Sequence, residues 1–209
     1  MRNTAITKDI QASLKPASVL QDLLAGNQRY TANNLTSSDV TSLVNQTTGG
    51  QHPKAVILSC IDSRVPVEMV FDQTIGDVFV ARVAGNFENV DILGSMEYSC
   101  AVAGSKLVLV LGHEACGAVK AACDGVELGN ITSMLSNIMP AVKKSSEEVE
   151  GEANSSNPEF VAKTVENNVL LTVERIREKS PILKDMEENG EIKILGGIYS
   201  LETGKVTML

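Results

Sequence analysis

The stretch AVILSCIDSR, residues 55–64, joins an apolar run to a row of reactive side chains. Residues 55–59 form a short run rich in β-branched residues, which is typical of a strand buried on both faces of a sheet. Cys60, Asp62 and Arg64 follow at alternate positions, so all three can point the same way from an extended chain. The stretch therefore predicts a buried strand that delivers a thiol, a carboxylate and a guanidinium to its carboxyl end.

The rest of the chain alternates between strand and helix patterns. Strands are predicted at residues 77–83, 106–112 and 191–200, the last followed by a turn at 202–204 and a short final strand. Apolar positions at helical spacing predict helices at residues 18–30, 90–104, 117–125, 128–144 with a break at Pro140, and 158–180. This alternation predicts an α/β fold. We expect one domain over residues 1–209, with a central, mostly parallel β-sheet flanked by helices and an N-terminal helical arm at about residues 1–50.

The composition limits the kinds of partner. Hydrophobic residues make up 43% of the 209 residues and charged residues 21%, which indicates a globular chain and not a disordered one. The net charge is -8 and the basic residues are scattered, so we expect no nucleic-acid partner. No apolar run approaches the roughly 18 residues of a membrane span, so we expect no membrane partner. The N-terminus lacks the apolar core of a signal peptide. This predicts a cytoplasmic protein, or a periplasmic one if a signal peptide has been removed.

The four cysteines fall into two kinds. Cys60 and Cys116 lie in polar motifs, whereas Cys100 and Cys123 lie in apolar helical patterns. A free cysteine in such a pattern usually packs as a small hydrophobic residue. Only the first two are therefore candidates for chemistry.

Two of the polar motifs lie where a parallel sheet places its sites. Cys60 and Asp62 follow one predicted strand, and His113 and Cys116 follow another. Such sites form beyond the carboxyl ends of the strands. Thiolate, imidazole and carboxylate are all zinc ligands, and zinc takes four in a tetrahedron. If the two strands are neighbours, these four side chains predict a zinc site.

The residues alone leave alternatives open. Without a metal, Cys60 would be a buried thiol beside a surface ion pair of Asp62 and Arg64. With a metal, Asp62 decides the kind of site. If it binds zinc, the site is closed, as structural zinc sites are; if it pairs with Arg64, water can bind, and the pKa of that water falls to about 7.

The motifs CIDSRVP and GHEACGAVK resemble the signature of the β-class carbonic anhydrases, which is Cys–x–Asp–x–Arg followed by His–x–x–Cys. Other segments are also similar to the family, namely LLAGNQRY, GQHPKAVILSC, GDVFVARVAGN and GGIYSLETGKV. The resemblance covers about residues 23–125 well and the remainder loosely.

The resemblance implies an enzyme that reversibly hydrates carbon dioxide to bicarbonate and a proton. Cys60, His113 and Cys116 would hold Zn²⁺, and a zinc-bound hydroxide would attack carbon dioxide. Asp62, paired with Arg64, would accept a hydrogen bond from that hydroxide and orient its lone pair towards carbon. Asp62 and Arg64 are therefore the expected catalytic residues.

The resemblance also implies a substrate pocket. Gln51, Phe79 and Tyr98 match the Gln, Phe and Tyr that line the family's pocket. Gln51 would donate its amide to a substrate oxygen, while Phe79 and Tyr98 would keep the site apolar. Gly117 would present a backbone N–H to the substrate at the start of a helix. Ala84 stands where many relatives carry Val, which predicts a slightly wider pocket.

Two further residues bear on proton transfer and regulation. His52 could relay protons near neutral pH, or it could be an ordinary surface histidine. Some relatives bind a second, non-catalytic bicarbonate through a Trp, an Arg and a Tyr. Arg82 matches the Arg, but Ile57 stands at the Trp position and the chain has no Trp, so we do not expect this regulation.

The resemblance implies a homodimer or a dimer of dimers, with the pocket at the subunit interface and carbon dioxide or bicarbonate as the small-molecule partner. Two other functions stay open. One is hydrolysis of a carbon dioxide analogue such as carbon disulfide or carbonyl sulfide. The other is a non-catalytic zinc protein with Asp62 on the metal, which would not need Arg64, Gln51 or Tyr98. A redox role is not favoured, because there is no Cys–x–x–Cys pair.

Overall fold

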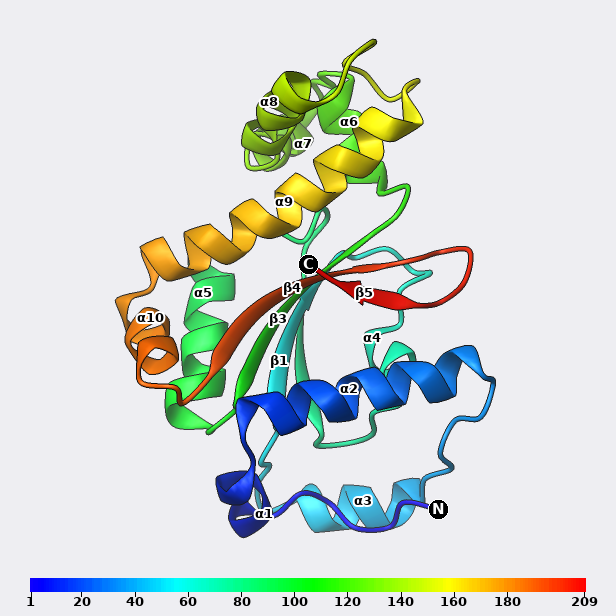
Figure 1. Cartoon of the computed structure of the whole chain (residues 1–209). Helices are drawn as coiled ribbons and strands as arrows, with labels where there is room; N and C mark the ends of the chain where they lie inside the picture. Colours follow the sequence, from blue (N-terminus) through cyan, green and yellow to red (C-terminus); the bar gives the residue numbers. More distant parts are fainter.

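Five strands build the centre of the fold in the computed structural model, which describes residues 1–209 (Figure 1). They are β1 (Ala55–Ser59), β2 (Val78–Arg82), β3 (Leu107–His113), β4 (Lys193–Tyr199) and β5 (Val206–Met208). The sheet order is β2-β1-β3-β4-β5; the first four strands run parallel, and β5 is antiparallel to β4. The predicted single α/β domain with a mostly parallel sheet is confirmed.

The two strands that precede the polar motifs are neighbours in the middle of the sheet. Every residue of β1 and of β3 is buried. Their apolar sequences suit this position, because a central parallel strand faces helices on both sides. By contrast, β2 forms one edge of the sheet and its residues are only partly buried or exposed.

Helices cover both faces of the sheet (Figure 1). One face packs against α2 (Pro16–Thr31) and α4 (Val67–Val70). The other face packs against α5 (Val90–Glu97), a π-helical turn (Tyr98–Val102), α9 (Pro158–Lys179) and α10 (Pro181–Glu188). The predicted helices at 90–104 and 158–180 are thus present. No helix combines the length and the apolar character that crossing a bilayer requires.

Three shorter helices gather at the amino end of α9. They are α6 (Gly117–Cys123), α7 (Gly129–Leu135) and α8 (Met139–Glu148). The region 128–144 was expected to be one helix broken at Pro140, but it forms two helices that separate before this residue. Pro140 lies in the first turn of α8. A proline is tolerated there, because the first N–H groups of a helix have no partner within the helix.

The first 50 residues hold α1 (Lys8–Ser13), α2 and α3 (Val40–Thr47). Val19 and Leu23 of α2 are fully buried against the sheet of their own chain. Gln11 of α1 is also buried, and its Nε2 donates to the carbonyl oxygens of Pro53 at 2.7 Å and Ala103 at 2.8 Å. These contacts fasten the N-terminal helices to the amino end of β1.

Candidate metal centre

The three candidate metal ligands converge at the carboxyl edge of the sheet. Cys60 directly follows β1, His113 ends β3, and Cys116 precedes the first turn of α6. The ligand atoms of these three side chains all lie within 4.8 Å of one another, and all three residues are buried. Adjacent parallel strands explain the convergence, because Ser59 of β1 pairs with Leu111 of β3 in the register.

The distance between the two sulfurs fits a shared zinc ion. Sγ of Cys60 lies 3.9 Å from Sγ of Cys116, and both cysteines are free thiols. Two sulfurs that each lie about 2.3 Å from a tetrahedral zinc are about 3.8 Å apart. The pair therefore has the spacing of two thiolate ligands on one metal.

The histidine is oriented as a ligand. His113 Nδ1 lies 2.8 Å from the carbonyl oxygen of Glu114, and a carbonyl can only accept, so Nδ1 carries the ring proton. The lone pair is then on Nε2. This atom is fully buried and has no hydrogen-bond partner. A buried nitrogen without a partner is costly, and a metal ion would satisfy it.

The environment of Cys60 favours its thiolate. The pKa of Cys60 is lowered to about 4, chiefly because the thiol of Cys116 donates to it, and this outweighs the opposite effect of burial. The backbone N–H of Gly85 also donates to Cys60 Sγ, at 3.4 Å. The pKa of Cys116 is raised, because its proton is held by the sulfur beside it and because it is buried. Metal binding would displace that remaining proton.

Asp62 faces Arg64 in this structure. Its Oδ1 accepts from Arg64 Nε at 2.9 Å, and its Oδ2 accepts from Arg64 Nη2 at 2.7 Å. This bidentate pair holds the pKa of Asp62 well below its usual range. Oδ2 is also 3.9 Å from His113 Nε2. Of the two alternatives that the sequence left open, the structure has the carboxylate on the guanidinium, beside the ligand cluster.

Arg82 has a part in this site that the sequence did not reveal. Its Nε donates to the carbonyl oxygen of Cys60 at 2.8 Å, and its Nη2 donates to that of Asp62 at 2.6 Å. The guanidinium thus holds the backbone on both sides of Ile61. Arg82 lies beside the end of β1 because it pairs with Ser59 in the parallel register. A signal for this contact appears only once the sheet order is known.

The predicted pocket residues lie elsewhere in the chain, apart from Gly117, which directly follows the ligand Cys116. Phe79 pairs with Val56, four residues before Cys60, which is about 13 Å along a strand. The rings of Phe79 and Tyr98 meet edge to face, with centroids 6.2 Å apart.

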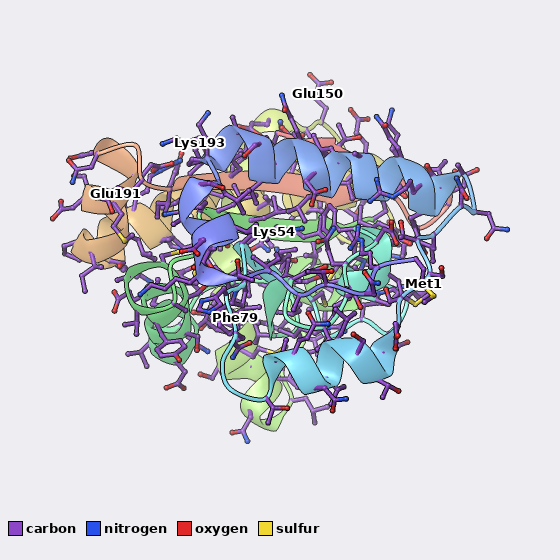
Figure 2. The ribbon with its side chains drawn as sticks, turned by 90° about the horizontal axis from the view of Figure 1, so that it is seen from below. Met1, Lys54, Phe79, Glu150, Glu191 and Lys193 are labelled. Atoms are coloured by element: carbon purple, nitrogen blue, oxygen red, sulfur yellow. The ribbon has the colours of Figure 1, made fainter.

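Phe79 and Tyr98 line a groove of about 760 Å³ between β2 and α5. Gln51 precedes β1 and is exposed, and His52 lies beside it near α1 and α3. Figure 2, drawn from this side of the molecule, labels Phe79 and also Lys54, which directly precedes β1. Within one chain, Gln51, Phe79 and Tyr98 are therefore not brought to the ligands.

Comparison with known proteins identifies the family. A family model described as carbonic anhydrase matches residues 55–206, which is more than half of the chain. Carbonic anhydrase 2 of Mycobacterium tuberculosis is 32% identical over 201 residues, covering 92% of each chain. The carbonic anhydrase of Mycolicibacterium smegmatis is 34% identical over 195 residues, covering 92% of this chain and 93% of its own.

Solved structures agree with this result. The Coccomyxa β-carbonic anhydrase in complex with acetazolamide aligns with a TM-score of 0.71 at 25% identity, covering 94% of this chain and 87% of that one. The β-carbonic anhydrase CcaA aligns with the same TM-score and identity, covering 91% and 87%. Both alignments cover more than nine-tenths of this chain. The chain therefore belongs to the carbonic anhydrase family, in its β class.

Proposed function

We propose that the protein catalyses the zinc-dependent, reversible hydration of carbon dioxide to bicarbonate and a proton. The observation that carries this proposal is the convergence of Cys60, His113 and Cys116 beside an Asp62–Arg64 pair that leaves the carboxylate off the ligand cluster. Membership of the family supports it, since hydration of carbon dioxide is the general reaction of carbonic anhydrases.

The three buried residues Cys60, His113 and Cys116 would hold Zn²⁺, which when bound supplies a nucleophile at neutral pH by lowering the pKa of a water to about 7. Three protein ligands leave a fourth position open, as catalytic zinc sites do. Asp62 does not compete for this position while both of its oxygens accept hydrogen bonds from Arg64.

Asp62 would act by orienting the attacking oxygen. Asp62 is ionised near neutral pH, as an ordinary aspartate is, and Arg64 holds its pKa lower still, so it can only accept hydrogen bonds. A hydroxyl beside it would therefore donate its proton to Asp62, so Asp62 would orient the oxygen that attacks the substrate. Arg82 supports this role by holding the carbonyl of Asp62, and Gly117 would offer its backbone N–H to a substrate oxygen.

We also propose that the working unit is a homodimer or a dimer of dimers. Strand β2 is apolar and is the edge of the sheet, and the exposed fractions of the nearby Val90 and Val102 are 80% and 73%. Unpaired apolar edges favour association. The Sordaria macrospora β-carbonic anhydrases that share this fold, at 22% identity and a TM-score of 0.70, are described as tetrameric. A second copy would allow Gln51, Phe79 and Tyr98 of one chain to reach the metal centre of the other.

Stopped-flow measurement of carbon dioxide hydration against pH, on protein of measured zinc content, tests the proposal. We expect about one zinc per chain, turnover that rises with pH near neutrality, and loss of turnover when a chelator removes the metal. Recovery of activity on adding Zn²⁺ back is the control for damage by the chelator. Protein that holds no zinc, or that shows no hydration above background at any pH, would contradict the proposal.

A further inference from the structure

Helix α9 carries two adjacent asparagines in its middle, Asn167 and Asn168, and each is only 1% exposed. Asparagine is a poor helix former, and a buried amide costs free energy unless it is hydrogen-bonded. The apolar stripe that predicts this helix gives no reason for either residue. Each must therefore be explained by what its amide contacts.

The two amides serve different neighbours. Nδ2 of Asn167 donates to Ser145 Oγ at 2.9 Å and to Glu148 Oε2 at 2.8 Å, and both acceptors belong to α8. Nδ2 of Asn168 donates instead to the carbonyl oxygen of Gly85, at 2.7 Å. Asn167 thus joins one helix to another, whereas Asn168 reaches the loop that follows β2.

Gly85 in turn contacts the candidate metal centre. Its backbone N–H donates to Sγ of Cys60. Its φ of +84° favours glycine, and an added Cβ would lie 2.5 Å from Ile138 Cδ1. Gly85 therefore has little freedom to move. Asn168 binds the carbonyl oxygen of Gly85, and the N–H of Gly85 donates to the sulfur of Cys60.

The same part of α9 also lies against the second ligand strand. A Cβ on Gly112, the residue before His113, would lie 2.5 Å from Val169 Cγ2. Farther along the helix, the buried carboxylate of Glu88 lies 2.9 Å from Arg175 Nε and 2.8 Å from Lys179 Nζ. The loop after β2 is therefore held to α9 at two points, Gly85 and Glu88, and the first of these contacts a ligand.

We propose that Asn168 is a positioning residue for the metal centre, because it fixes Gly85 so that the N–H of Gly85 donates to the Cys60 thiolate. A hydrogen bond from a backbone N–H to a ligand sulfur orients that sulfur and tunes its bonding to a metal. This inference rests on the proposed zinc site and adds a residue that lies one contact behind the ligands.

The test compares Asn168→Leu with Asn167→Leu. Both replace a buried helical amide by an apolar side chain of similar size, but only the first removes the donor to Gly85. The readouts are the zinc dissociation constant, measured by competition with a chromophoric chelator, and the thiolate-to-cobalt charge-transfer band of the Co²⁺-substituted protein. For Asn168→Leu we expect zinc affinity to fall about 10- to 100-fold and the band to shift. For Asn167→Leu we expect wild-type values of both, even if thermal stability is lower.

The outcomes separate this inference from the proposed function. If the wild-type protein binds no zinc, the proposed function fails first, and this inference fails with it. If the wild type binds zinc but Asn168→Leu matches it in affinity and band position, the positioning role is wrong. Equal losses in both variants would also overturn it, since they would reflect general packing. Asn168→Ala, which improves helix propensity, gives the same comparison if the leucine variant does not fold.

Discussion

The two ends of strand β1 differ in whether a single chain supplies all the residues of the site that is predicted there. At the carboxyl end, Cys60 contacts the thiol of a second cysteine, and Asp62 contacts the guanidinium of an arginine, both in the same chain. At the amino end, Gln51 is exposed, while Phe79 and Tyr98 line an open groove far from the ligands. The single chain therefore brings together all residues of the candidate metal centre, whereas the predicted substrate pocket would need the assembly that we propose.

This difference has a physical origin in the sheet. Adjacent parallel strands deliver their carboxyl ends to one edge, so short motifs after β1 and β3 meet without help from distant elements. Residues near the amino ends are carried to the opposite edge by the same geometry. Substitutions at the two ends should therefore separate metal binding from assembly.

The largest effect is expected from Cys60→Ser. A serine hydroxyl is not ionised near neutral pH, so the site loses a ligand, and we expect zinc content below about one-tenth of wild type with hydration at background. The oligomeric state should not change, because Cys60 lies at the other end of β1. Zinc analysis, stopped-flow hydration and light scattering measure the three quantities.

Cys100→Ser is the matched control for this experiment. Cys100 is also a buried free thiol, and burial raises its pKa to about 12, but it belongs to the π-helical turn on the sheet face. It should keep zinc and activity and lose only some stability. Cys60→Ser with a full zinc complement would show that Cys60 is not a ligand.

Asp62→Asn is expected to have the next largest effect. The amide can donate towards the attacking oxygen and no longer forms the charged pair with Arg64, so the orientation of the nucleophile is lost. We expect kcat/KM for hydration to fall roughly 100-fold or more with zinc retained. Asp124→Asn, at a carboxylate that binds Ser155 instead, is the control and should be active. Wild-type turnover in Asp62→Asn would remove Asp62 from the mechanism.

A pH profile of Arg64→Gln separates two ways in which Arg64 can matter. Without the guanidinium, the pKa of Asp62 should rise towards its ordinary value of about 3.9, which still leaves it ionised at pH 7. The loss of activity should therefore come from misplacement and persist as pH increases. Recovery of wild-type turnover between pH 7 and 9 would instead show that Arg64 acts only by keeping the carboxylate charged.

The sequence predicted most of the residues of the candidate site at the carboxyl end of β1, but few of the contacts that hold them in place. The three ligands could be placed together because strand ends and parallel topology imply it. The direction in which Asp62 points could not be predicted, because binding to the metal and pairing with Arg64 differ only in the placement of one side chain. Arg82 and Asn168 act from other elements, so their contacts depend on sheet register and on which turn of α9 meets the loop. Apolar periodicity predicts which face of a helix is buried, but it does not predict which turn of the helix meets a given loop.

The double variant Val90→Arg and Val102→Arg, at the two ends of the helical segment beside β2, should break the proposed assembly. Both side chains are largely exposed in the single chain, so the variant should fold, while a partner would have to bury two charges. We expect monomers by sedimentation, unchanged zinc content and hydration lower by about tenfold, because the pocket is incomplete. Leu128→Arg, at a residue 63% exposed on a different surface, is the control. A fully active monomer would show that the pocket needs no partner.

The smallest effect is expected at the ligand turn itself. Ala115, between His113 and Cys116, has a φ of +50°, which costs a residue with a Cβ about 1 to 2 kcal/mol. Ala115→Gly removes this strain but adds about 0.5 to 1 kcal/mol of backbone entropy to the unfolded chain. We therefore expect the free energy of unfolding of the metal-free protein to rise by about 0.5 kcal/mol, as measured by denaturant titration.

Ala121→Gly, the same exchange inside α6, should instead lower the free energy of unfolding by about 1 kcal/mol. The opposite signs would show that the left-handed turn between the ligands is built into the single chain before any metal or partner binds. Equal losses in the two variants would mean that the turn relaxes without its metal. The carboxyl end of β1 would then also depend on something that the single chain does not supply.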